Sequence, residues 1–180
     1  MKSNNILKTL KQFSKLLLFA TFIIIIAYFF FPELKLPQNI IVDKILVEKS
    51  KRKMNVFSKG EKLKTYTISL GFQPIGKKQF EGDGKTPEGK YFIVSKNNHS
   101  IAFKSLGISY PNADNRKFAA HYRKSAGGNI MIHGMMNNFW YWGKFHRFMD
   151  WTGGCIALTN NEMDDLFKHV NVGCEIEIVE

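Results

Sequence analysis

The sequence predicts a mainly β domain, a sandwich or barrel, attached to one N-terminal transmembrane helix. Two observations support the β assignment. Short alternating apolar segments separated by glycine and proline turns recur over residues 45–109, and a last alternating segment covers residues 174–179. A third observation predicts the transmembrane helix, because residues 16–31 contain no charged side chain. The expected fold class is therefore mainly β, with a short helix near the C-terminal end.

The uncharged N-terminal run has the composition of a helix that spans a bilayer. It lasts from Lys15 to Glu33, which is at the short end of the roughly 17–25 residues that a span requires. Lysines precede it, so the positive-inside rule predicts a cytoplasmic N-terminus. A cleaved signal peptide is the competing interpretation, but no small-x-small cleavage site follows. The expected organisation is a basic N-terminus (1–15), an uncleaved signal anchor (16–32), a linker (33–42) and a folded domain (43–180).

The domain divides into strands and helices at its turns. We expect a hairpin of residues 45–49 and 54–57, and further strands over residues 63–70, 91–94, 101–109 and 129–134. A short helix is expected over residues 114–124. A second helix begins at the capping box Thr159–Glu162, and its apolar residues then repeat at helical spacing. Gly173 is expected to end this helix, before a strand over residues 174–179.

The net charge of +11 favours an anionic neighbour, such as nucleic acid, a phospholipid surface or a charged wall polymer. The basic run over residues 114–124 is weak evidence for nucleic acid, since no recognised binding fold surrounds it. We therefore expect no nucleic-acid partner. Carboxylates and histidines show no metal motif such as His-Glu-x-x-His, so no metal or cofactor is expected.

Cys155 follows two glycines, and this turn is the first candidate for chemistry. Such a turn can expose a thiol and direct several backbone N–H groups at one point, as a nucleophile with an oxyanion site requires. The alternative is a small buried cysteine that begins a strand. A disulfide with Cys174 would silence the thiol, but it is disfavoured because each cysteine begins its own strand.

Among five histidines, His133 has the best context for a general base, because it leaves an apolar strand directly before Gly134. His146 is nearer to Cys155 in sequence but lies within an aromatic segment, residues 135–151. This segment has no clean helical or strand period. It is expected to be a flap, partly core and partly facing the substrate.

These motifs, in this order, resemble the L,D-transpeptidase (YkuD-like) catalytic domain, in its murein L,D-transpeptidase branch. The resemblance covers roughly residues 43–180 and implies the mixed β-sandwich of that domain. The motifs that carry it are Ile132-His133-Gly134, Thr152-Gly153-Gly154-Cys155-Ile156-Ala157-Leu158, Asp83–Tyr91 with its Thr-Pro-Glu-Gly, Gly107–Asn112, and Asp150-Trp151-Thr152.

The resemblance also implies roles for residues. Cys155 is the nucleophile, His133 is the general base and acid, and the backbone carbonyl of Gly134 orients the imidazole. The main chain around Gly153, Gly154 and Cys155 forms the oxyanion hole. The residues expected to bind substrate are Thr152, Tyr110, Trp140, Trp142 and Trp151.

The implied reaction is acyl transfer on peptidoglycan stem peptides at a bacterial inner membrane, with the catalytic domain in the periplasm or otherwise outside the membrane. An amine or a wall-linked protein is the acceptor; water would give L,D-carboxypeptidase trimming instead. The interpretation from another class is a catalytically silent wall-binding module. Many relatives carry His at the position of Gly153 and Arg or Asn at that of Ala157. These departures leave the donor and acceptor preference open.

Overall fold

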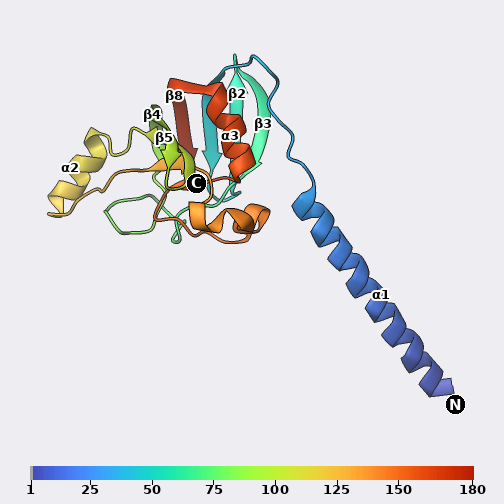
Figure 1. Cartoon of the computed structure of the whole chain (residues 1–180). Coiled ribbons are helices and arrows are strands. Elements are labelled where there is room, and N and C mark those ends of the chain that lie inside the picture. The colour runs from blue at the N-terminus through green and yellow to red at the C-terminus, as the bar shows by residue number, and fades with distance from the viewer. Residues whose placement is uncertain (1) are drawn as a thin grey trace. The chain divides into compact units, whose positions relative to one another are not determined.

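The computed structural model describes residues 2–180, and their side chains from residue 6 onward. The chain forms two compact units, Met1–Glu33 and Leu34–Glu180. The first unit is the helix α1 (Lys2–Phe30), drawn in blue in Figure 1. Its part Ile6–Phe30 is long and apolar enough to cross a membrane. The helix ends two residues before Pro32, and at its other end it extends beyond the predicted span 16–32, because isolated lysines do not interrupt a helix.

The second unit is built on one mixed eight-stranded sheet in the order β3-β2-β1-β8-β4-β5-β6-β7. The strand pairs β1·β8 and β6·β7 are parallel, and the other neighbours are antiparallel. The strands are β1 (Val42–Glu48), β2 (Lys53–Ser58), β3 (Glu61–Thr67), β4 (Gly89–Ser100), β5 (Phe103–Ile108), β6 (Met131–His133), β7 (Ile156–Ala157) and β8 (Val170–Val179).

The sheet curls so that the chain just after one edge strand, β3, reaches the other edge strand, β7. Ser69, just after β3, bridges to Ala157 of β7, and each backbone N–H donates to the other's carbonyl at 2.9–3.2 Å. The concave interior holds the apolar core, with fully buried side chains such as Ile45, Tyr66 and Ile156. The predicted mainly β, mixed-sheet fold is confirmed, in the form of a curled half-barrel with helices (Figure 1).

Three helical segments complete this unit: α2 (Ala113–His121), the 3₁₀ segment η1 (Asn137–Phe148) and α3 (Asn160–His169). The predicted capping box of α3 is present, with Thr159 and Glu162 each bonded to the other's backbone. The expectation that Gly173 ends this helix is wrong. The helix ends at His169, and Gly173 (φ +94°) lies inside β8, where the register against β1 shifts.

The segment predicted as a linker is packed against the second unit over part of its length. Leu36 is buried in the core, and its backbone N–H donates to the Asp165 carboxylate at 2.9 Å. Burial of the apolar Leu36 side chain therefore holds this part of the segment against the domain, beside α3. The compact unit begins at Leu34 and not at residue 43.

Candidate active site

The pairing of β5, β6 and β7, at one edge of the sheet, brings His133 and Cys155 to one face of the sheet. His133 pairs with Ala157 on one side and with Ser105 on the other. Cys155 precedes Ala157 by two residues, so the two side chains share a face, whereas Ile132 and Ile156 point into the core. His133 and Cys155 line the same groove, which has a volume of about 420 Å³.

The imidazole of His133 is held by the backbone of the next residue. Its Nδ1 lies 2.6 Å from the carbonyl oxygen of Gly134, so Nδ1 carries the proton and Nε2 is left as an acceptor. The side chain is buried, and this burial lowers the pKa of His133 below its ordinary 6.5, while the Gly134 carbonyl acts in the opposite direction. A neutral imidazole at pH 7 is the form that accepts a proton.

Cys155 is half-buried and carries a free thiol, whose Sγ donates to the carbonyl of Asn129 at 3.5 Å. Burial raises the pKa of Cys155; the backbone of Met131 and the positive charge of Lys78 oppose this rise. The resting thiol is therefore protonated and needs a base. Cys174 is also free, and its burial raises its pKa to about 12.

The turn before the cysteine is braced by Thr152. Its hydroxyl donates to the Cys155 carbonyl at 2.7 Å and accepts from the Gly154 N–H at 3.1 Å. Thr152 is buried, so it braces the turn and does not face the groove. Because the Gly154 N–H is already bonded to Thr152, the N–H groups of Gly153 and Cys155 remain as the predicted donors of the oxyanion hole.

The structure does not bring all the predicted substrate-binding aromatics to the groove. Tyr110 is buried, its hydroxyl donates to the Ala126 carbonyl at 2.9 Å, and its ring packs on that of Tyr91. The expectation that Tyr110 binds substrate is therefore wrong, because the side chain belongs to the core. The ring of Trp151 meets that of His133 edge to face at 5.7 Å. Trp142 lines an adjoining apolar hollow, and Trp140 lines neither cavity.

The groove also has polar side chains that the motifs do not mark. They come mainly from the β4–β5 hairpin, where Ser105 pairs with Asn97 on the next strand. In the sequence, only the alternation of side chains along a strand could indicate these residues. The pairing of β4 with β5 decides which of the two alternating sets of side chains faces Cys155. These additional polar groove residues are Asn97, His99, Ser100, Ser105 and Asn129.

The predicted flap is a wall fixed to the domain. His146 is fully buried, its Nδ1 lies 2.9 Å from the Ser69 hydroxyl, and that hydroxyl donates to the His146 carbonyl at 2.7 Å. Burial lowers the pKa of His146 to about 4, with help from the charge of Arg147. Asp150 accepts from both Arg52 and the Leu70 backbone.

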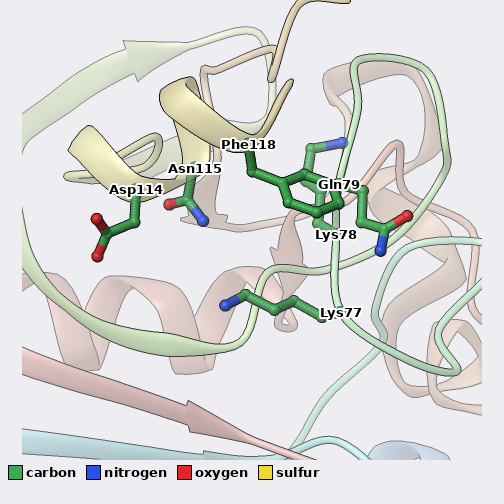
Figure 2. A pocket seen from close by; sticks show the side chains of 6 residues that line it. All are labelled: Lys77, Lys78, Gln79, Asp114, Asn115 and Phe118. Atoms are coloured by element: carbon green, nitrogen blue, oxygen red, sulfur yellow. The ribbon is translucent and has the colours of Figure 1, made fainter. Parts of the chain in front are cut away.

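A separate cavity of about 260 Å³ lies between the loop Lys77–Gln79 and α2 (Figure 2). Asp114, Asn115 and Phe118 of α2 form its other side. The buried Lys78 ammonium pairs with Asp83 at 2.7 Å, so its charge is largely compensated. None of the predicted site residues lines this cavity.

Comparisons with known proteins indicate the family of this chain. Residues 42–178 match the YkuD family, the L,D-transpeptidase catalytic domain. The chain is 32% identical over 133 residues to YafK of Escherichia coli (strain K12), which its name describes provisionally as an L,D-transpeptidase; the match covers 70% of this chain and 46% of YafK.

Two solved structures share the fold. One is a mutant of Pgp2, the helical cell shape determining protein of Campylobacter jejuni, with a TM-score of 0.59, 25% identity, and coverage of 81% of this chain and 50% of that one. The other is Bd1075 of Bdellovibrio bacteriovorus, with a TM-score of 0.56, 20% identity, and coverage of 82% and 51%. The chain thus spans about half the length of these relatives. By the match over residues 42–178, the chain belongs to the YkuD family of L,D-transpeptidase catalytic domains.

Proposed function

We propose that this chain is a cysteine acyltransferase that performs L,D-transpeptidation on peptidoglycan stem peptides. The observation that carries the proposal is the pairing of two groups in one groove. Cys155 supplies a free thiol, and His133 presents Nε2 as an acceptor because its Nδ1 is bonded to the Gly134 carbonyl. Nucleophilic catalysis by a thiol needs such a base, itself held in position by a third group.

The proposed reaction begins with proton transfer from the Cys155 thiol to His133 Nε2 as the sulfur attacks the carbonyl of the L-centre. The Sγ–C bond forms, and the N–H groups of Gly153 and Cys155 stabilise the oxyanion. The C–N bond to the D-residue then breaks, and its amine leaves with the proton from the imidazolium. An amine acceptor attacks the thioester carbonyl and gives a proton to His133. The new C–N bond forms, the C–Sγ bond breaks, and the imidazolium returns the proton to Cys155 Sγ.

The raised pKa of Cys155 and the lowered pKa of His133 favour a concerted version of the first step. Burial disfavours both the thiolate and the imidazolium, so a resting ion pair would be destabilised. The neutral pair avoids this cost until the substrate carbonyl is in place. His133 therefore acts as a general base during attack.

The cellular setting belongs to the same proposal. The apolar helix α1 would be an uncleaved anchor, with the N-terminus inside and the catalytic unit outside the inner membrane. Since the similar Pgp2 is a cell shape determining protein, wall remodelling that affects shape is the proposed role. A wall-linked protein is a further acceptor class.

Product analysis with the purified full chain tests the reaction. A tetrapeptide stem with an amine acceptor should give the cross-linked product and a released D-residue, as measured by mass spectrometry. His133→Gln should lower the rate about 10²- to 10⁴-fold, and Cys155→Ala should abolish the product. His121→Gln, at an exposed histidine of α2, is the matched control and should keep the wild-type rate.

The alternatives give different products in the same assay. Tripeptide without cross-link, at the same yield with and without the amine, identifies L,D-carboxypeptidase trimming. No conversion by a folded, reduced chain that retains peptidoglycan in a pull-down contradicts the enzyme and identifies a wall-binding module.

A further inference from the structure

Within the aromatic segment, residues 135–149 have an inverted distribution of side chains. Its large aromatic side chains are exposed, at 73% for Phe148, 66% for Trp140 and 56% for Tyr141. Its charged and titratable side chains are buried: Lys144 is 8% exposed, His146 is 0% exposed, and the Arg147 side chain is 8% exposed. A segment that faces water has the opposite pattern. The medium outside this segment is therefore expected to be apolar.

The exposed rings sit on a fixed support. His146 is bonded to Ser69, and Arg147 forms a buried ion pair with Glu162 at 2.9 Å. These two anchors come from the sheet and from α3, so they hold the segment at two sides. The exposure of the rings is consequently a property of the folded structure, and not of a loose loop that would close over them.

The segment also contains an apolar hollow of about 210 Å³. Its lining consists of methionine, phenylalanine and tryptophan side chains, which suit hydrocarbon and offer a polar ligand almost no hydrogen-bond partners. Exposed apolar patches of this kind mark protein or membrane contacts. The lining residues are Met135, Met136, Phe139, Trp142, Met149 and Trp151.

We propose that the aromatic segment docks on a lipid bilayer, with its rings at the interface and its hollow against the acyl chains. Tryptophan and tyrosine prefer this interface because their rings are apolar and their N–H and O–H groups polar. The same chain carries a helix, Ile6–Phe30, with the length and composition of a membrane span. Residues 33–180 have 22 Lys and Arg against 15 Asp and Glu, a net charge of +7, which also favours anionic lipid surfaces.

Docking would have a consequence for the catalytic groove. Met136 lines both the hollow and the groove that contains His133 and Cys155. A bilayer surface against the hollow would therefore lie beside the groove and limit the directions from which a substrate enters. This inference concerns location and does not depend on the reaction that Cys155 performs.

The tryptophans of the chain make the proposal directly measurable. The chain has three tryptophans, Trp140, Trp142 and Trp151, and each lies in the aromatic segment. We would reconstitute the full chain into phosphatidylethanolamine–phosphatidylglycerol vesicles, with and without brominated acyl chains. Bromine near the glycerol end should quench most of the emission from the exposed tryptophans.

A charge on the docking face should release the segment from the bilayer. Tyr141→Glu places a carboxylate between two exposed tryptophans and should restore most of the quenched emission. Ile75→Glu is the matched control, since Ile75 is 78% exposed and lies outside the segment, and its quenching should equal that of the wild type. Both positions are exposed, so neither change removes core packing.

Equal emission from plain and brominated vesicles would overturn the proposal, as would unchanged quenching in Tyr141→Glu. Emission that responds to soluble N-acetylglucosamine oligomers, or to protein concentration, but not to brominated lipid would also overturn it and assign the face to glycan or to a second copy. Acylation of Cys155, measured in the same samples, tests the proposed function separately.

Discussion

Of the two glycines before Cys155, only Gly154 has a conformation and surroundings that exclude a side chain. Its φ is +130°, and a Cβ would lie 2.6 Å from the Lys85 carbonyl oxygen. Gly153 has an ordinary φ and nothing within 4 Å of the same position. Gly154→Ala should lower the free energy of unfolding by about 3 kcal/mol, whereas Gly153→Ala should change it by less than about 0.5 kcal/mol. Urea denaturation measures both; equal losses would contradict this account of the turn.

The protonation state of His133 predicts the acid limb of the acylation rate. The base must be neutral, and burial lowers its pKa below 6.5. Lowering the pH to 6.5 should therefore leave most of the rate intact, and the fall should come at a lower pH. The rate of acyl-enzyme formation against pH measures this. A half-maximal rate above pH 6.5 would contradict the lowered pKa of His133.

At the scale of single residues, the sequence marks the chemistry better than the surroundings. His133 and Cys155 can be singled out as candidates because a strand that ends in His-Gly and a Gly-Gly-Cys turn are local patterns. The position of the Tyr110 side chain could not be predicted, because the strand register decides whether a ring faces the core or the groove. Here the Tyr110 ring packs on Tyr91 in the core. The hydrogen bond from the Gly154 N–H to the Thr152 hydroxyl is likewise set by the folded turn and has no pattern of its own in the sequence.

The helix α3 owes part of its stability to its N-terminal capping box. The Thr159 hydroxyl accepts from the Glu162 N–H and donates to the Glu162 carboxylate, in a buried setting. Thr159→Ala should cost about 1 kcal/mol of unfolding free energy. Lys168→Ala, which breaks an exposed pair with Asp164 in the same helix, should cost less than about 0.5 kcal/mol. Denaturant unfolding compares them, and an equal cost would show that the cap contributes no more than a surface pair.

Among the elements, those with a strong local signal are predictable, and those set by tertiary contacts are not. The capping box of α3 and the β1–β2 hairpin match their predictions. The role of Gly173 does not, because a positive φ serves a helix end and a strand irregularity equally well. The lack of period in η1 has a physical reason, since the helical angles break at Phe139 and Gly143. Its exposed aromatic rings and buried charged side chains depend on the contacts of His146 with Ser69 and of Arg147 with Glu162 of α3.

For the whole molecule, buried His146 predicts loss of stability in acid. In the unfolded chain this imidazole has a pKa near 6.5, whereas burial in the folded chain lowers the pKa to about 4. Between these values the unfolded state binds more protons, so the free energy of unfolding falls as the pH falls, by up to about 3 kcal/mol. His146→Gln should flatten this dependence, while His121→Gln, at an exposed position, should keep it. Parallel slopes for wild type and His146→Gln would contradict the assignment.

At this largest scale the fold class follows from alternation and turn spacing, but the strand order does not. The curl of the sheet depends on the bridge between Ser69 and Ala157, two residues far apart in sequence with no mutual signal. That bridge also positions the aromatic wall, because Ser69 holds His146. The sequence therefore marks the candidate residues, and the closure of the sheet determines which side chains surround them.

The central claim is that Cys155 becomes acylated with His133 as its base, and one measurement tests it most directly. Intact-protein mass spectrometry of the full chain, incubated with a tetrapeptide stem and no amine acceptor, should detect an added tripeptide acyl group. The adduct should map to Cys155, be absent from Cys155→Ala and form far more slowly in His133→Gln. An unmodified wild-type chain that releases product, or an adduct that persists in Cys155→Ala, would contradict the claim.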